Sequence, residues 1–316
     1  MWRLFCLFAP MPFLACAQAS YTTSTVDVNG NRVALGPTSS TSRNDNTTTT
    51  TQTLRSINGR SVPVEQVEER VLRDDANGKT VERIVRRYDE TGNPAGVRRT
   101  VTEQENHAGG GSTTHSTTYA ADINGRMAVT ERSTTETQVS GSTVTADTLV
   151  ERPTINGSLE PVEKQNVVTA KNGKNYQEAA ITFRKDPSGQ FEAAVRTTTE
   201  HSESGNKVSE NTAEYEIGPN GNLELHSQKV VNSQTGQNGR ENKEVDIFRK
   251  NVPGVVNDTG SLQLIEHQII ERRPGDGGIV ETISVQRPTV ADPRRLGPPR
   301  QLSETVCRGN CQPQQP

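Results

Sequence analysis

Apolar and polar residues alternate along most of the chain, in stretches whose residue types favour β-strand. The segments Ile181–Arg184 and Phe191–Thr199 show the pattern: valine, isoleucine and threonine recur at alternate positions. Glycine-containing turns separate these stretches at steps of about 16 residues. If a turn takes four residues, each strand has about 12 residues and is about 40 Å long.

The turn glycines follow a fixed register. One set recurs every 32 or 33 residues, and a second set lies halfway between its members. The first set is Gly59, Gly92, Gly125, Gly157, Gly189, Gly221 and Gly254, and the second is Gly78, Gly110, Gly141, Gly173, Gly205 and Gly236. Strands joined by tight turns pair as antiparallel neighbours. The spacing therefore predicts an all-β fold over residues 54–287: an antiparallel meander of 32-residue hairpin repeats, in a single-layer or rolled sheet. A β-solenoid that coils every 32 residues is the alternative.

Aromatic residues keep the same register. Tyr119, Phe183, Tyr215 and Phe248 each lie six residues before a glycine of the first set, and Phe191 lies two residues after one. This alignment predicts an apolar stripe across the sheet near one of its edges. We interpret the stripe as the aligned core of the repeats. The alternative is a binding surface for a glycan or a protein, with Tyr119, Phe183, Phe191 and Tyr215 as its binding residues.

The first residues are typical of an export signal. Arg3 precedes an apolar stretch, and Ala17-Gln18-Ala19 fits a cleavage site, so that a signal peptide over residues 1–19 is expected. We therefore predict a secreted, cell-surface or periplasmic protein, and no other segment is long and apolar enough for a transmembrane helix. Phe13-Leu14-Ala15-Cys16 resembles a bacterial lipobox, which makes Cys16 a candidate for lipidation.

Two further segments flank the repeats. Residues 20–53 are rich in threonine, serine and asparagine, and we expect a flexible stalk or a degenerate first repeat there. Residues 288–316 are rich in proline, arginine and glutamine without an apolar period, which predicts a disordered tail.

Composition excludes several classes of protein. Only 30% of the 316 residues are hydrophobic and 4% are aromatic, and four of the aromatics lie in the first 13 positions. A thick enzyme core is therefore not expected. An outer-membrane barrel needs an apolar band with aromatic girdles, which the remaining aromatics are too few to supply. The net charge of −3 and the small, scattered basic clusters argue against nucleic-acid binding.

Few residues offer chemistry. Cys307 and Cys311 are expected to form a disulfide in an oxidising compartment, either with each other or between molecules, because no histidine or second cysteine pair lies nearby to complete a metal site. No nucleophile elbow, phosphate-binding loop or metal motif is present in the sequence. We therefore predict a protein that is not an enzyme and uses neither cofactor nor metal.

One short motif suggests a family. The segment Tyr88-Asp89-Glu90-Thr91-Gly92-Asn93 resembles the YD motif of Rhs/YD-repeat proteins. The segments 119–125 and 183–189 resemble the motif less closely. The resemblance implies secreted β-hairpins that wind into extended sheets or shells. The step of 32 residues is longer than in that family, and the chain is too short for a closed shell.

Together these observations predict a non-catalytic exported protein with a structural, adhesive or surface-interaction role. Its partners would be an extracellular or envelope protein or a glycan, and free strands at both ends of an open sheet would allow edge-to-edge self-association. The alternatives are a ligand-binding module that uses the aromatic stripe and a largely disordered secreted chain.

Overall fold

The computed structural model describes residues 16–26, 31–45, 47–57, 59–122, 125–218, 220–236, 238–250, 261–275, 278–289, 295–309 and 311. Most of the predicted signal peptide and Gly254 lie outside these residues. The secondary structure of the described part is β throughout, as the alternating pattern predicted.

The strands follow one another along the chain with short connections. They are β1 Cys16–Val26, β2 Arg32–Ala34, β3 Thr38–Asp45, β4 Thr48–Ile57, β5 Arg60–Asp75, β6 Gly78–Tyr88, β7 Pro94–Asn106, β8 Ser112–Ala121, β9 Met127–Ser140, β10 Thr143–Pro153, β11 Leu159–Asn172, β12 Asn175–Lys185, β13 Phe191–Ser204, β14 Lys207–Ile217, β15 Leu223–Thr235, β16 Glu241–Arg249, β17 Gln263–Gly275, β18 Gly278–Gln286 and β19 Arg300–Gly309.

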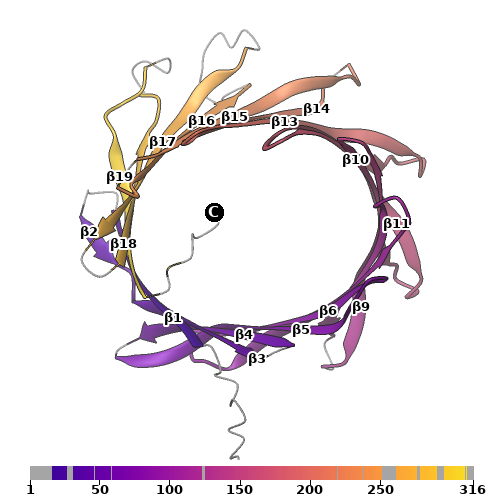
Figure 1. The fold of residues 1–316 in the computed structure, drawn as a ribbon, viewed down its shortest axis with the longest axis horizontal. Coiled ribbons are helices and arrows are strands. Elements are labelled where there is room, and N and C mark those ends of the chain that lie inside the picture. The colour runs from indigo at the N-terminus through magenta and orange to yellow at the C-terminus, as the bar shows by residue number, and fades with distance from the viewer. Residues whose placement is uncertain are drawn as a thin grey trace, which may run out of the picture.

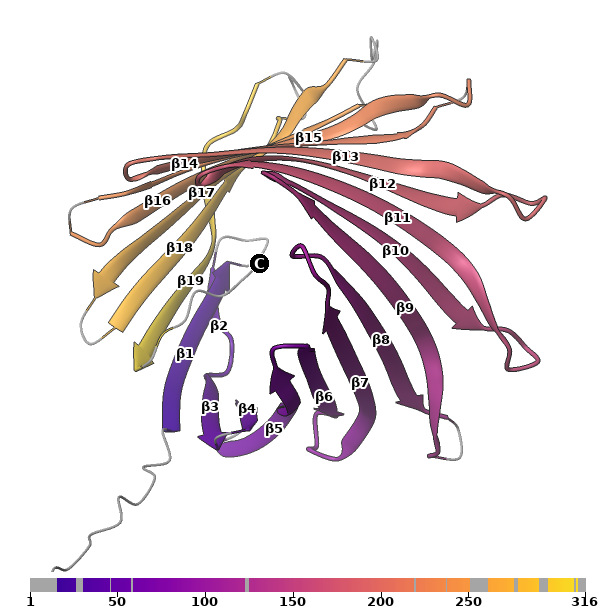
Figure 2. The same cartoon turned by 45° about the vertical axis from the view of Figure 1, so that its right-hand side comes forward.

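The sheet closes on itself. Each strand from β3 to β18 pairs antiparallel with the next, and β1 pairs with both β3 and β19, while the short β2 lies beside β1. Eighteen strands therefore form a closed barrel, whose ribbon is a ring in Figure 1 and is seen tilted in Figure 2. The predicted antiparallel meander is confirmed. The open single-layer sheet and the solenoid were wrong, because the first and last strands of the meander meet and pair.

The repeat has a simple structural basis in the middle of the chain. Strands of 14 residues (β9, β11, β13) alternate with strands of 11 residues (β10, β12, β14). Two-residue turns join β11 to β12 and β13 to β14, with Gly173 and Gly205 at φ +62° and +61°. Such short turns require a left-handed first residue, which glycine adopts without a steric penalty.

The turns at the other end of the barrel are longer and are stabilised by an aspartate. In the turn between β12 and β13, the Asp186 carboxylate accepts hydrogen bonds from the Ser188 hydroxyl and from the Gln190 backbone N–H, both at 2.8 Å. These bonds, the Ser188 bond first, lower the pKa of Asp186 below its usual value. Turn geometry thus explains the sequence Asp186-Pro187-Ser188-Gly189.

A β-bulge recurs in nearly every repeat, next to the aromatic position. The pairing register shifts between Thr118 and Tyr119, between Thr182 and Phe183, and between Glu214 and Tyr215. Further shifts at the same place in other repeats are those at Arg87/Tyr88, Val150/Glu151 and Ile247/Phe248. Bulges bend a strand and increase its twist, and evenly spaced bulges therefore curve the sheet until it closes.

The structure differs from the sequence expectation at both ends of the chain. The strand β19 lies within residues 288–316, for which the sequence analysis predicts disorder. Apolar and polar residues alternate over part of it, and it pairs with both β18 and β1. Strands β1, β3 and β4 likewise lie in residues 16–57, so that the Thr-rich segment contributes to the barrel wall. The expected free edges are absent from the described strands of the ring, because β1 and β19 pair with each other.

The two faces of the barrel wall as the candidate functional surface

The side chains of the barrel wall divide into an inner and an outer face. On β13 one face is half-buried and comprises Val195, Thr197, Thr199 and His201. On the other face, Arg196, Glu200 and Ser202 are exposed. Side chains on the concave side of a curved sheet converge and shield one another, whereas those on the convex side spread apart. We therefore assign the half-buried face to the lumen and the exposed face to the outside.

The register extends this assignment around the ring. Cross-strand partners lead from His201 through Glu210, Val231 and Val245 to Gln268 and Val285. Val245 and Val285 are 3% and 4% exposed and are among the most buried residues of the described chain. These cross-strand partners therefore form one row that lines the lumen over β13–β18. The valines of this row lie on β15, β16 and β18.

The lumen face has an excess of acidic residues on three neighbouring strands. The face of β12–β14 carries six glutamates and one arginine, which lies on β12: Glu178, Glu192, Glu203, Glu210, Glu214, Glu216 and Arg184. The face of β6 and β7 carries three arginines: Arg83, Arg87 and Arg98. These two groups of strands lie on opposite sides of the ring (Figure 2). The arginines of β6 are partly balanced by Glu65 and Glu69 of β5, and Glu65 contacts Arg87 at 3.5 Å. The lumen therefore has its acidic excess on β12–β14.

A ring contact belongs to the acidic side. The Tyr176 and His201 rings stack with their centroids 4.7 Å apart, and His201 Nδ1 lies 3.6 Å from a Glu210 carboxylate oxygen. Burial, followed by the charges of Glu210 and Glu178, raises the pKa of Tyr176. Sequence analysis missed this cluster, because the four residues lie on three strands and only the pairing register brings them together.

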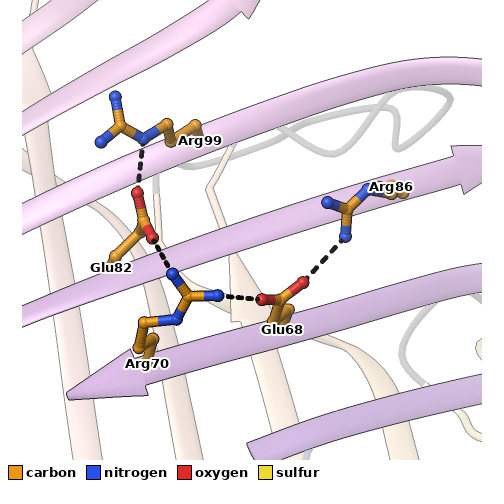
Figure 3. Close-up of polar contacts among 5 residues, drawn as sticks. All are labelled: Glu68, Arg70, Glu82, Arg86 and Arg99. Carbon is orange, nitrogen blue, oxygen red and sulfur yellow. Dashed lines mark hydrogen bonds and ion pairs between the residues drawn. The ribbon is translucent and has the colours of Figure 1, made fainter. Parts of the chain in front are cut away.

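The outer face carries a chain of ion pairs across β5, β6 and β7 (Figure 3). Glu68 contacts Arg86 and Arg70 at 3.2 and 3.0 Å, and Glu82 contacts Arg70 and Arg99 at 3.8 and 2.7 Å. Glu82 is only 9% exposed, because the two guanidinium groups cover it. All five residues lie well inside their strands, so the charges occupy the middle of the wall.

The predicted aromatic stripe also lies on the outer face, but its members are spread around the ring. Arg99 lies 5.3 Å from the Tyr119 ring centroid, and Arg196 lies 5.7 Å from that of Tyr215. Phe183 and Phe191 are brought together on β12 and β13, where Lys164 lies 4.4 Å from the Phe191 ring centroid. The stripe is therefore a row of separate aromatic–cation pairs, and only Phe183 and Phe191 share a site. The sequence signal for these pairs was the recurrence of a basic residue every 32 or 33 positions, at Arg99, Arg132, Lys164 and Arg196.

Other candidate chemistry is limited. The structure joins Cys307 and Cys311 in a disulfide beside the β1–β19 seam. Within the described residues, no three histidine, cysteine, aspartate or glutamate side chains lie close enough to hold a metal ion. Among the same residues, no helix is long and apolar enough to cross a membrane.

Comparison of the sequence with protein-family models and with curated proteins finds no match. Comparison of the structure finds OmpF of Salmonella typhi, solved as a complex with daunomycin. The TM-score is 0.50 at 9% sequence identity, over 94% of this chain and 97% of that one. The fold is porin-like. A porin-like protein from Bacteroides uniformis also matches, over 93% of this chain and 97% of that one at 7% identity, but its TM-score of 0.26 is too low to support an argument.

The porin-like barrel overturns the resemblance to Rhs/YD-repeat proteins. The Tyr88–Asn93 motif that suggested that family forms a turn in which Asp89 accepts backbone hydrogen bonds from Thr91 and Asn93. A tyrosine at a bulge followed by a turn that an aspartate stabilises is a feature of one hairpin. It therefore carries no information about how the hairpins assemble. The expectation that the chain is too short to close was also wrong, since 18 strands suffice.

Proposed function

We propose that this protein is a non-catalytic exported barrel that encloses a water-filled lumen for polar solutes, and whose outer wall contacts water or protein rather than lipid. The closure of 18 strands by the β1–β19 pairing carries this proposal. Barrels of about 16–18 strands are too wide for side chains to fill and leave an aqueous channel. The fold similarity to a porin supports the same channel-like architecture.

The charges of the wall argue against direct contact with lipid. On the outer face, Arg99, Asp147 and Arg196 lie within their strands, as do Arg83 and Glu178 on the lumen face. An arginine or lysine that faces lipid at the bilayer midplane costs about 2–4 kcal/mol. Neither face offers an uninterrupted apolar band, so this cost would be incurred many times around the ring.

The lumen charges suit the passage or retention of polar molecules. The excess of glutamates on β12–β14 gives this side of the lumen a negative potential, which attracts cations and favours polar solutes over apolar molecules.

An outer-membrane channel is the second candidate, and the fold similarity to OmpF favours it. It requires a partner that covers the charged outer wall. A structural or adhesive role is compatible with either candidate, since it would use the outer face alone.

Attachment at Cys16 would keep such a barrel at a membrane surface. The ladder between β1 and β3 begins at the pair Cys16↔Arg43. Cleavage after Ala19 would leave only Ser20↔Ser39 and Tyr21↔Thr38 of that ladder, whereas lipidation would make Cys16 the first residue and retain all six pairs. We therefore favour lipidation over cleavage after Ala19.

The mass of the exported protein tests this attachment. We expect an N-terminus at Cys16 with a mass increase from attached acyl chains, and release of the Cys16→Ser protein from the membrane fraction. A native protein that starts at Ser20 and carries no added mass would show that the leader is a conventional one.

The proposed barrel is tested with two cysteine variants on neighbouring positions of β13. Thr199→Cys places a thiol on the lumen face and Thr198→Cys places one on the outer face. Thiol reagents linked to polyethylene glycol of increasing size should cease to react with Thr199→Cys above a threshold, while Thr198→Cys reacts with all of them. Equal reaction at every size would mean that the sheet is open.

The lipid question needs a separate measurement. Purified protein mixed with dye-loaded phospholipid vesicles should cause no dye release. In a density gradient it should not float with the vesicles, except where an acyl chain on Cys16 attaches it to them. Spontaneous insertion with dye release by the Cys16→Ser protein would favour the outer-membrane channel.

A further inference from the structure

The outer wall contains a hollow that the proposed function leaves unexplained. Its volume is about 590 Å³, within the range of small-molecule sites, and it extends over β9–β13. Its lining residues are Thr134, Glu136, Asp147, Thr148, Leu149, Lys164, Gln165, Asn166, Phe183 and Phe191. No other place on the wall joins two members of the predicted aromatic stripe within the described residues.

Two adjacent rows of the pairing register build this hollow. Leu149, Lys164 and Phe183 are successive cross-strand partners and form the first row. Asp147 and Asn166 are partners in the second row. The first row provides apolar surface at Leu149 and Phe183, and the second provides hydrogen-bonding groups beside it.

The repeat beside the hollow lacks its aromatic residue. Glu151 occupies the position, six residues before Gly157, at which the neighbouring repeats carry Tyr119 and Phe183. Arg132 binds Glu151 with its Nε at 2.7 Å, and so holds the carboxylate against β9.

The acidic residues of the hollow form an unfavourable pair. Glu136 and Asp147 are directly opposite each other on β9 and β10, and both are exposed. Like charges at opposed positions destabilise a sheet. Asn166 donates a hydrogen bond to Asp147 at 2.7 Å, but within the described residues neither carboxylate has an ion-pair partner. A ligand that donates hydrogen bonds to both carboxylates would relieve this repulsion.

Lys164 supplies a donor on the opposite side. Its ammonium lies over the Phe191 ring and has no carboxylate partner within the described residues, which leaves its protons available to an acceptor. The hollow therefore combines an apolar floor, paired acceptors and a cationic donor.

We propose that this hollow binds an uncharged glycan, with sugar rings over Phe183 and Leu149. The C–H face of a pyranose is apolar and its rim carries hydroxyl groups, which donate to Glu136 and Asp147 and accept from Lys164. An anionic sugar would be repelled by the two carboxylates. The hollow is open at the wall surface, so a longer chain can continue in both directions. This inference deepens the proposed function, since it requires an outer wall that is not covered by lipid.

Binding is tested on the full protein with glucose and N-acetylglucosamine oligosaccharides of two to six units, by isothermal titration calorimetry. A sulfated oligosaccharide serves as the anionic comparison. We expect binding of an uncharged oligosaccharide, weakened about tenfold or more by Phe183→Ala, and no binding of the sulfated one. Phe248→Ala is the matched control, because Phe248 has the same repeat position on the same face but lies outside the hollow. Circular dichroism verifies the fold of each variant.

A second variant distinguishes a binding role from a structural one. Glu136→Gln should weaken binding and raise the melting temperature, because it removes the like-charge repulsion while it removes an acceptor. Failure of every uncharged oligosaccharide to bind, or equal loss with Phe248→Ala, would overturn the glycan site. Those results would leave the barrel intact if the Thr199→Cys size threshold holds, whereas spontaneous vesicle insertion would count against the proposed function itself.

Discussion

Removal of β19 should abolish cooperative folding of the whole barrel. A chain that ends at Pro299 loses the pairing of β19 with both β18 and β1, and with it the closure of the ring. The strands form a wall of a single layer, so each depends on its neighbours for burial. Strands β1 and β18 would then expose unpaired N–H and C=O groups, which recruit strands of other molecules. We expect no sharp transition in a thermal melt followed by circular dichroism, and large aggregates in light scattering.

The control is a chain that ends at Cys311, which retains β19 and the Cys307–Cys311 disulfide. It should melt like the full protein and remain a discrete species. If the chain that ends at Pro299 also melted cooperatively at the same temperature, the barrel would not be the folded state, and an open sheet would account better for the 32-residue repeat.

The strands and turns of this barrel could be predicted from the sequence, because both are local properties. Glycines such as Gly173 and Gly205 mark two-residue turns, and the residues between them alternate with period 2. Closure depends on small increments of bending that add up around the ring. The bulges at Tyr119, Phe183 and Tyr215 supply them, and a bulge next to an aromatic residue has no sequence signature of its own. The same meander was therefore compatible with an open sheet.

Composition was misleading about the shape of the wall. Few aromatics and many charges argue against an uninterrupted lipid-facing band, as do the ion pairs around Glu82, but what surrounds the wall stays a prediction. Such an argument concerns the lipid surface and not the barrel itself. Hydrogen bonds between strands close a barrel whatever medium surrounds it, so the two questions are independent.

The candidate sites depended on register in the same way. Phe183 and Phe191 could be singled out by their positions around Gly189, but their partners Leu149 and Lys164 come from the preceding repeat. Nothing in the sequence marks the glutamates of the lumen, since alternate positions on a strand do not show which face is concave. Only closure turns Glu178 and Glu214 toward the same enclosed volume.

The acidic side of the lumen should attract cations to a thiol placed on it, and this is the second large effect that we expect. Thr199 is the cross-strand partner of Glu178, and Glu210 and Glu214 lie on the next strand of the same face. In Thr199→Cys, a cationic methanethiosulfonate reagent should react faster than an anionic one of similar size. Replacement of Glu178, Glu210 and Glu214 by glutamine should lower the ratio of the two rates about tenfold at low salt.

Salt and position provide the controls for this charge effect. Thr198→Cys lies on the outer face between the partners Ala179 and Ala213, and its rate ratio should change little when the three glutamates are replaced. Raising the ionic strength to about 1 M shortens the screening length to about 3 Å, and should bring the ratio at Thr199→Cys close to that of the glutamine variant. A ratio that is the same for both thiols at low salt would mean that the glutamates do not share an enclosed lumen. The reagents, the strand and the fold are the same in both thiol variants. A difference between their rate ratios would therefore reflect the face on which the thiol lies.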